Sequence, residues 1–479
     1  MYKSPSRQRQ STLFWDLETM LDRRHPLFKL ANLIDWPSFE VAFSPLFCGE
    51  TGRPPKPIRL MVGLLMLKHI RNVSDEQVVA QFSENAYYQY FCGMESFTIA
   101  PPCASTELVH FRHRIGEAGI ELIFKESIRV NLLTDDRKKS EEDRGKDGRG
   151  RKPDREQIAF IDSTVQEKNV TFPTGSKLLN KIIEFCHKVA CREGIAVRQS
   201  YRRELKGLKR IQRFRGKAHS VKKVAKADRR MRTIAGRLVR ELLRELPIDS
   251  PYRERLELCL KFINGEKIDG HKIYSLHEPD VLCISKGKEH KKYEFGNKVS
   301  LVRLWSGIII GALSFRNEYD GHTIDKSMEQ VGRTYGRRIR ILGGDRGYRG
   351  KEKTGETKIV IPDVPKATDS AYTKAKKHAL FRKRAGIEPV IGHCKADHRL
   401  GRNFYKGIFG DSINVMLAAT AFNFKRVMNA LLCLIWGGLR WLILGHEGRI
   451  YQPVPVFIMT NNSREGFLRA DYVILQLHM

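Results

Sequence analysis

The stretch QIAFIDST, residues 157–164, is a short apolar run that ends in an acidic residue, Asp162. Such a run predicts a buried β-strand. A second stretch, RILGGDRGY (340–348), repeats the pattern and carries Asp345 at its end. Both acids would then lie at the edge of a sheet, where strands end and where α/β folds place their functional sites. Two strand-end carboxylates therefore define the candidate site.

A third acidic residue, Glu388, lies in the basic segment FRKRAGIEPVIGHCK (381–395). In one continuous helix, four residues of this segment would fall within an arc of about 60°: Phe381, Arg384, Glu388 and Lys395. Pro389 argues against a continuous helix, because proline removes a backbone donor and disfavours a helical conformation in the residue before it. We therefore expect a kink, or a new helix with Pro389 as its first residue.

Carboxylates arranged in this way hold divalent metal ions for phosphoryl transfer on nucleic acids. Asp162, Asp345 and Glu388 are therefore the candidate catalytic and metal-binding residues. A single aspartate at the end of a strand is more often a turn or capping residue. The prediction depends on two such residues occurring together with a downstream glutamate in a basic segment.

The charge of the chain predicts a polyanionic partner. It has 86 Lys and Arg against 54 Asp and Glu, a formal net charge of +32 and a pI near 9.9. Each Lys or Arg that meets a phosphate releases condensed counterions, so a surplus of this size favours nucleic acid. Residues 201–240 are the most basic stretch, and the candidate DNA-contacting residues there are Arg202, Arg203, Lys209, Arg210 and Arg213.

The sequence between the acidic strands and on either side of them predicts distinct regions. Apolar residues at helical spacing fill 54–70, and Ser74 with Gln77 forms a capping box for the helix that follows. Two short helices separated by a break resemble a helix-turn-helix, although an ordinary helical bundle fits equally well. The predicted regions are a helical N-terminal DNA-binding domain (12–133), a charged linker (134–157), a catalytic domain (158–430) with a helical basic insertion at about 175–270, and an apolar helix with an unassigned tail (431–479).

The remaining strand signals give the order of the sheet. Residues 293–305 and 307–315 predict a hairpin, a helix follows from 324, and KIVIP (358–362) predicts a further strand before a helix at 369–384. Strand, hairpin, helix, strand, strand, helix is the order of a ribonuclease-H-like sheet. In that fold the first and fourth strands lie adjacent and parallel, which would bring Asp162 and Asp345 together. The predicted fold is therefore α/β, preceded by an all-α domain.

The nine cysteines are scattered and form no CxxC pair, which favours reduced thiols and a cytoplasmic protein. The longest apolar run, LLCLIWGGLRWLILG (431–445), contains Arg440 and is too short to span a bilayer. We therefore expect a buried helix there and no association with a membrane.

Four stretches of the chain resemble a known family. They are PPKPIRLMVGLLMLKHIRNVSDEQVVAQFSENAYYQYFCGM, IDSTVQEKNVTFPT, KKYEFGNKVSL with GGDRGYRG, and FRKRAGIEPVIGHCK. The resemblance is to DDE-type bacterial insertion-sequence transposases of the insertion-sequence-five-like group. The last stretch matches the family's Tyr-(2)-Arg-(3)-Glu-(6)-Lys signature at Phe381, Arg384, Glu388 and Lys395, with phenylalanine in place of the signature tyrosine.

The resemblance implies an enzyme that cuts the ends of an insertion sequence and joins them to target DNA. It implies two Mg²⁺ ions, or Mn²⁺ in their place, held by Asp162, Asp345 and Glu388. Arg384 and Lys395 would neutralise phosphates, the first as a fork and the second as a point charge. The implied partners are the terminal inverted repeats and target DNA, both double-stranded, and a second copy of the chain in the active complex.

Two other functions fit the same residues. The first is a catalytically inactive or domesticated sequence-specific DNA-binding protein, which Phe381 and the unusual tail keep open. The second is a ribonuclease-H-like nuclease without strand transfer. It would need neither the basic insertion nor the helical N-terminal region.

Overall fold

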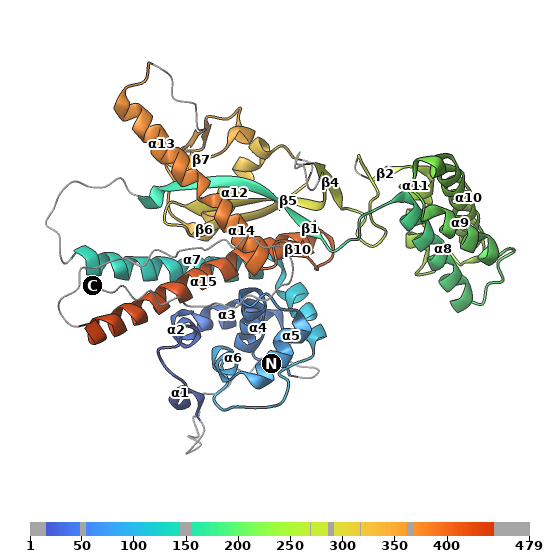
Figure 1. Ribbon diagram of the computed structural model, residues 1–479. Coiled ribbons are helices and arrows are strands. Elements are labelled where there is room, and N and C mark those ends of the chain that lie inside the picture. The colour runs from blue at the N-terminus through green and yellow to red at the C-terminus, as the bar shows by residue number, and fades with distance from the viewer. Residues whose placement is uncertain are drawn as a thin grey trace, which may run out of the picture. The chain divides into compact units, whose positions relative to one another are not determined.

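The computed structural model describes residues 16–47, 54–143, 155–268, 270–285, 292–316, 318–361 and 368–444 (Figure 1). The chain divides into two compact units, Met1–Leu432 and Cys433–Met479. The first unit contains the helical N-terminal region, the sheet and the helical insertion. It therefore contains every candidate site residue.

The N-terminal region is entirely helical. Its α-helices are α1 (Leu17–Met20), α2 (Pro26–Leu33), α3 (Trp36–Phe43), α4 (Ile58–Ile70), α5 (Asp75–Glu84), α6 (Ala86–Phe91) and α7 (Ser105–Asp143), which bends at Gly116. Nearly every residue of α4 is buried, because this helix is apolar on all sides and forms the centre of the region. The capping box of Ser74 and Gln77 at the start of α5 is confirmed.

Helices α4 and α5 follow one another as in a helix-turn-helix, but the charge of α5 does not favour entry into a DNA groove. Its sequence, DEQVVAQFSE, contains three acidic residues and no lysine or arginine. Asp75 points back to the helical region, where its carboxylate accepts two hydrogen bonds from Arg112 and one from Lys68. The helical-bundle interpretation therefore accounts for α4 and α5 better.

One mixed sheet forms the centre of the region that the sequence predicts to be catalytic. Its strands are β1 (Ile158–Lys168), β4 (Leu282–Ser285), β5 (Tyr293–Leu304), β6 (Ile309–Phe315), β7 (Ile341–Gly343), β8 (Lys353–Thr354), β9 (Thr357–Val360) and β10 (Arg402–Asn403). The strand order is β4-β5-β1-β7-β9-β8, with β6 beside β5 and β10 beside β1. Strand β1 is antiparallel to β5 and parallel to β7. This is a ribonuclease-H-like arrangement, and the predicted fold class is confirmed.

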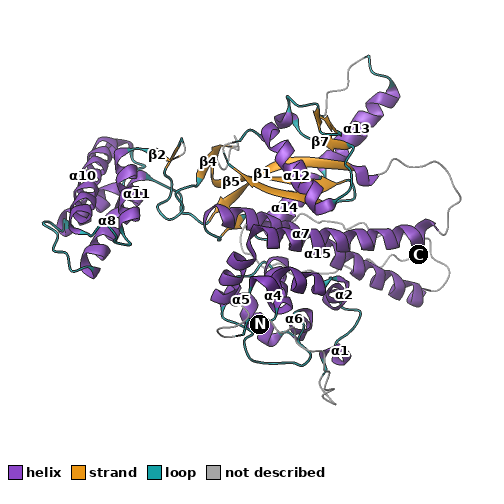
Figure 2. Cartoon of the chain, turned by 180° about the vertical axis from the view of Figure 1, so that it is seen from behind, coloured by secondary structure: helices purple, strands orange, loops and turns teal. Residues whose placement is uncertain are grey.

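Helix α7 lies beside the part of α15 (Gly407–Leu444) that precedes Cys433, and both pack against the sheet (Figures 1 and 2). Asn423 of α15 joins the three elements. Its side chain bonds to both backbone groups of Ile309 on β6 and donates to the hydroxyl of Ser127 on α7. Because Asn423 is fully buried, these bonds satisfy a polar group that would otherwise be costly to bury. The N-terminal helices are thereby fixed to the catalytic sheet.

The insertion is a separate helical bundle with its own apolar core. It consists of α8 (Gly175–Arg192), α9 (Arg202–Gln212), α10 (Val221–Glu245) and α11 (Arg253–Asn264), followed by the small strands β2 (Lys267–Ile268) and β3 (His271–Lys272). Leu205 and Leu208 of α9 face this core, while Phe214 is 44% exposed. The side of α9 that packs on this core therefore ends before Phe214.

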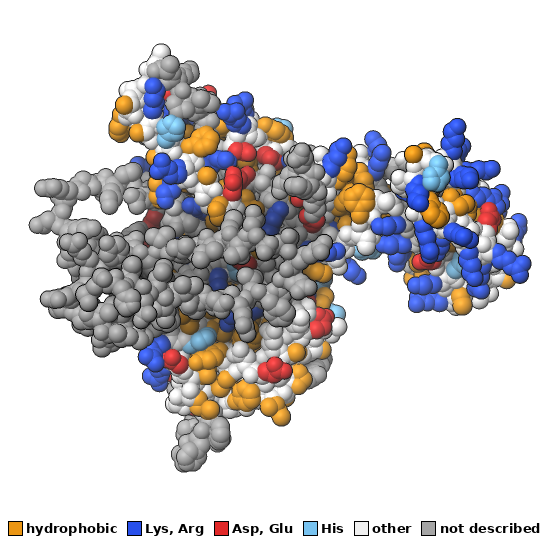
Figure 3. All heavy atoms as spheres, in the orientation of Figure 1, with side chains coloured by type: hydrophobic (Ala, Val, Ile, Leu, Met, Phe, Trp, Pro, Cys, Tyr) orange, Lys and Arg blue, Asp and Glu red, His pale blue; other side chains and the backbone are white. Residues whose placement is uncertain are grey.

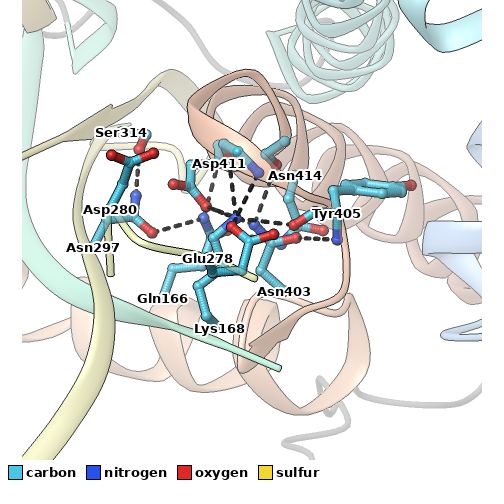
Figure 4. Close-up of polar contacts among 12 residues, drawn as sticks. Gln166, Lys168, Glu278, Asp280, Asn297, Ser314, Asn403, Tyr405, Asp411 and Asn414 are labelled. Atoms are coloured by element: carbon cyan, nitrogen blue, oxygen red, sulfur yellow. Dashed lines mark hydrogen bonds and ion pairs between the residues drawn. The ribbon is translucent and has the colours of Figure 1, made fainter. Parts of the chain in front are cut away.

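A network of buried polar groups joins the end of β1 to the segments that follow the insertion (Figure 4). Lys168 is nearly inaccessible, and its ammonium lies 2.7 Å from Asp411 Oδ1 and 3.3 Å from Glu278 Oε2. Asp411 also accepts from Arg316 at 3.0 Å and from Asn403 at 2.8 Å. Burial raises the pKa of Asp411, while the two cations oppose that shift.

Two predicted regions have different limits in the structure. Helix α7 continues to Asp143, ten residues into the segment interpreted as a linker, and residues 144–154 lie outside the described part. Helix α15 runs through the predicted boundary at 430 to Leu444, and the tail from 445 is not described. Among the described residues, no helix is both long enough and apolar enough to cross a membrane.

Candidate active site

Asp162 and Asp345 lie at the same level of neighbouring parallel strands. Phe160 of β1 pairs with Gly343 of β7, and each aspartate is two residues beyond its member of that pair. The predicted strand end at Asp162 is wrong, because β1 continues to Lys168. Asp162 lies within the strand, where its Oδ1 accepts from the Ser163 N–H at 2.8 Å. The predicted meeting of these two strands is confirmed.

Asp345 follows the end of β7 and begins the short 3₁₀ helix η5 (Arg346–Tyr348). Its Oδ1 accepts the Gly347 N–H at 2.9 Å, so the carboxylate caps this turn. The capping bond limits the rotation of the Asp345 side chain. Asp345 is thus both the capping residue of η5 and a member of the candidate site.

Arg384 and Glu388 lie on two consecutive helices that meet at a bend. Helix α13 (Ala371–Ala385) carries Arg384, and α14 (Ile387–Asp397) carries Glu388 and Lys395. The expected fresh helix start is present, but Pro389 is the third residue of α14 and not the first. The interruption follows from Gly386 together with Pro389, since both residues disfavour a continuous helix.

Arg384 lies between the carboxylates of the two elements. Its Nη1 is 3.9 Å from Asp162 Oδ2, and its Nη2 is 3.8 Å from Glu388 Oε1. Both distances exceed those of a charge-assisted hydrogen bond, so the guanidinium is held by charge and not by a closed fork. The Arg384 side chain is 15% exposed and that of Glu388 is 67% exposed. Glu388 is therefore the more solvent-exposed carboxylate of the two that flank Arg384.

The pKa of Asp162 reflects its burial and the two other carboxylates of the triplet. Burial, together with the charges of Asp345 and Glu388, raises the pKa of Asp162 to about 6. The Ser163 N–H and Arg384 act in the opposite direction. A carboxyl group with this pKa gains strongly from a nearby cation, because the cation offsets both the burial and the repulsion.

The three carboxylates are the type of ligand that a divalent metal ion needs, but in this structure they lie too far apart to bind one ion together. Three carboxylates supply the hard oxygen ligands that Mg²⁺ prefers. Among the described residues, no group of three His, Cys, Asp or Glu side chains lies close enough to hold a metal ion. Arg384 occupies the space between Asp162 and Glu388, and the exposed Glu388 side chain is the one with room to turn inward.

Comparison with known proteins identifies the family. Residues 15–114 match the family described as a transposase domain (DUF772), and residues 268–424 match the family described as a transposase DDE domain. The chain is 37% identical over 195 residues to the uncharacterized protein ORF8 in the nfe locus of Rhizobium meliloti, an alignment that covers 40% of this chain and 87% of that protein. The chain belongs to the DDE transposase family. No solved structure matches it.

The family match places part of the site in context. The DDE match covers Asp345, Arg384 and Glu388, while Asp162 lies before it. DDE transposases typically use a divalent metal ion and bind DNA. The roles of the individual side chains in this transposase are proposals.

The residues predicted to contact DNA divide into two groups. Phe381 is 46% exposed, and its ring centroid lies 5.9 Å from the Arg384 guanidinium carbon, so it belongs to the site. Lys395 is half-buried, seven residues beyond Glu388 on α14. The second group lies on or directly after α9 in the insertion and is exposed throughout: Arg202, Arg203, Lys209, Arg210 and Arg213.

Lysine and arginine side chains gather over α8–α11 in the space-filling view (Figure 3). Some of these cations have acidic partners within the insertion. Lys209 lies 2.9 Å from Glu184, and Arg230 pairs with Glu204. Within the described residues, Arg203, Arg210 and Arg213 form no such pair with an acid, so their charge is available to an external anion.

Three further side chains of the site carry no local signal in the sequence. Ser163, Lys298 of β5 and Asp320 lie beside the two aspartates and are joined by hydrogen bonds. Lys298 stands in the family-like stretch KKYEFGNKVSL, and Asp320 stands in DGHT, whose local pattern indicates only a helix start. Their position depends on the packing of β5 and β6 against β1, which no local pattern reveals.

The raised pKa of Asp162 predicts a cost in stability for the metal-free protein. Its folded-state pKa lies above the ordinary value of 3.8, so stability present at low pH is lost as the pH rises from about 4 to about 6. We expect Asp162→Asn to raise the free energy of unfolding at pH 7.5 by about 1–3 kcal/mol in a chelator, and to raise it little at pH 4. Urea unfolding at the two pH values tests this. Equal or lower stability of the variant at pH 7.5 would contradict it.

Proposed function

We propose that this transposase cuts DNA at the ends of an insertion sequence and joins the freed ends to target DNA by metal-dependent phosphoryl transfer. The observation that carries the proposal is the register of β1 and β7, which sets Asp162 level with Asp345, with Arg384 between Asp162 and Glu388. The nuclease without strand transfer would share these acids but would not need the basic insertion.

Asp162, Asp345 and Glu388 are the proposed holders of two Mg²⁺ ions, or of Mn²⁺ in their place. When bound, such a pair supplies activation of the attacking oxygen and stabilisation of the leaving oxygen. The chain contributes the arrangement of the ligands. Ser163 fixes the Asp162 carboxylate, Gly347 fixes that of Asp345, and the exposed Glu388 completes the set by turning toward them.

Arg384 has a second proposed role, as a contact to the DNA backbone. Because its distances to both carboxylates are long, its donors are free to engage a phosphate once the carboxylates have another counter-charge. Lys395 would supply a further point charge. Phe381 provides an apolar face beside Arg384, where the family signature has a tyrosine hydroxyl.

The first strand would be cut by water, and the freed 3′-hydroxyl would then attack target DNA. The scissile phosphate must lie between the three carboxylates for both steps. The proposed partners are the terminal inverted repeats and target DNA. Bringing two ends together requires at least a homodimer in the active complex, and we place the protein in the cytoplasm with the nucleoid DNA on which it would act.

The direct test uses a DNA duplex that carries the gene's own flanking repeat. We expect cleavage at the boundary of the repeat in the presence of Mg²⁺ and none in EDTA. The alternative is a catalytically inactive or domesticated DNA-binding protein, which the exposure of Glu388 and the presence of Phe381 favour. Tight binding to the same duplex without cleavage under any Mg²⁺ or Mn²⁺ concentration would support that alternative.

The basic surface of α9 predicts a salt-dependent contribution to DNA binding. Replacing Arg203, Arg210 and Arg213 by alanine should weaken binding to all sequences alike and reduce the slope of log K against log salt by about 1 for each phosphate that is no longer neutralised. Lys326→Ala is the matched control, since Lys326 is exposed but already paired with Glu318. The binding constant is measured by fluorescence anisotropy at salt concentrations from about 50 to about 200 mM. An unchanged slope in the triple variant would assign DNA binding to another surface.

A further inference from the structure

Asp320 is a fourth acidic residue beside the candidate triplet. It follows β6 and begins the 3₁₀ helix η4 (Asp320–Thr323), and its side chain is 19% exposed. Its Oδ2 accepts from the Ser163 hydroxyl at 2.8 Å, and its Oδ1 lies 2.9 Å from the Lys298 ammonium. Both oxygens of this carboxylate therefore already have a close partner.

Ser163 links Asp320 to Asp162. Its backbone N–H donates to Asp162 Oδ1 at 2.8 Å, while its hydroxyl donates to Asp320 Oδ2. One residue thus binds two carboxylates through two separate donors. Because the Ser163 hydroxyl is held by Asp320, the backbone position that fixes Asp162 is held as well.

Gly347 links Asp320 to Asp345. The Gly347 N–H donates to Asp345 Oδ1, and a Cβ atom at this glycine would lie 3.0 Å from that oxygen and 3.7 Å from Asp320 Oδ2. The two carboxylates therefore approach the same small volume beside Gly347. The η4 and η5 turns, which carry Asp320 and Asp345, pack against one another.

Lys298 makes the approach of so many acids possible. A cation beside Asp320 offsets part of its repulsion with Asp162 and Asp345. Lys298 lies on β5 opposite Val165 of β1, so the sheet itself fixes its position. The Lys298 ammonium and the Ser163 hydroxyl each bind one carboxylate oxygen of Asp320. A metal ligand would need such an oxygen free, so this arrangement favours a role for Asp320 that does not involve contact with the metal.

We propose that Asp320 is a positioning residue of the active site, which holds Ser163 and Lys298 and thereby sets the Asp162 and Asp345 carboxylates for metal binding. The inference rests on the proposed function, because it assigns Asp320 to the same carboxylates. Partners of this kind behind metal-binding side chains typically change metal affinity or activity by about 10- to 100-fold.

The test measures Mn²⁺ binding to the full-length protein by isothermal titration calorimetry, with no DNA present. We expect Asp320→Asn to weaken Mn²⁺ binding by about 10- to 100-fold, and Ser163→Ala to act in the same direction. Because both act through one hydrogen bond, the double variant should be little worse than the more severe single variant. Asp325→Asn is the matched control, since it removes the same charge from an exposed carboxylate that contacts Lys351 and Thr354.

Each outcome bears on the proposal. Affinity unchanged within about twofold in Asp320→Asn would overturn it, as would full additivity in the double variant. Loss of binding equal to that of Asp162→Asn would make Asp320 a direct ligand and also overturn the positioning role. If Asp320→Asn fails to fold by circular dichroism, Ser163→Ala decides, since it removes only a hydroxyl.

Mn²⁺ binding and DNA cleavage, measured on the same proteins, separate this inference from the proposed function. A wild-type protein whose Mn²⁺ binding depends on Asp320 but which cleaves no flanking DNA would refute the proposed reaction and leave the inference standing. A wild-type protein that cleaves DNA with Mg²⁺, together with an Asp320→Asn variant that cleaves equally well at every Mg²⁺ concentration, would do the reverse. A wild-type protein that binds no Mn²⁺ would overturn the inference.

Discussion

Asp162→Asn and Glu388→Gln should each abolish DNA cleavage and leave DNA binding intact. Either change removes a charged ligand from the proposed metal site, and the several kcal/mol that such a site supplies correspond to a rate loss on the order of 10³-fold or more. Binding should survive, because neither residue belongs to the basic surface of α9. Cleavage and gel-shift assays on one flanking-repeat duplex give the two readouts.

The control for this prediction is Glu329→Gln, which neutralises an exposed carboxylate on α12 (Ile324–Tyr335) that pairs with Arg333. It should cleave at the wild-type rate. Full cleavage by either Asp162→Asn or Glu388→Gln with Mg²⁺ present would remove the triplet from the mechanism. Loss of binding together with cleavage would instead point to a folding defect, which the higher stability expected for Asp162→Asn argues against.

Asp411→Ala should cause the largest loss of stability among the substitutions proposed for this chain. The change leaves Lys168 and Arg316 without their shared carboxylate and removes one of the two acceptors of the Asn403 amide. Removing one partner of a buried charged network typically costs about 3–5 kcal/mol, because the remaining charge stays buried. The expected result is a lower urea midpoint of unfolding at neutral pH, with the loss of hydrogen-exchange protection centred on β1 and β10.

Lys326→Ala provides the comparison for Asp411→Ala. Its partner Glu318 is 32% exposed and Lys326 itself 59%, so the ion pair is screened by solvent and should contribute under about 1 kcal/mol. If Asp411→Ala were as mild as Lys326→Ala, the network around Lys168 would not be a structural junction. Such a result would also weaken the view that this network holds the end of β1 at Lys168.

Local signals in the sequence were sufficient for much of the fold. The apolar run before Asp162 forms the first part of β1, and Ser74 with Gln77 caps α5, since both features depend on neighbouring residues alone. The order of strands then fixed the pairing of β1 with β7, because a ribonuclease-H-like sheet allows few alternatives. The fold class and the meeting of Asp162 with Asp345 could therefore be predicted.

Other features depend on contacts between distant segments. The approach of Asp320 to Ser163 spans 157 residues and requires the hairpin of β5 and β6 to be placed first. The position of Pro389 in α14 follows from where α13 ends, and helix ends are poorly marked when Gly386 and a proline compete to set them. The acidic residues of α5 are visible in the sequence. That Asp75 binds Arg112 and Lys68 inside the helical region depends on the packing of α5 against α4 and α7.

The central claim is that Asp162, Asp345 and Glu388 together form a metal-dependent site for DNA strand transfer. The measurement that tests it most directly is the joining of a pre-cut repeat end to a target plasmid by the purified full-length protein. We expect joined products with Mg²⁺ or Mn²⁺, none in EDTA and none with Glu388→Gln. Joining that persists in EDTA, or that Glu388→Gln carries out at the wild-type rate, would contradict it.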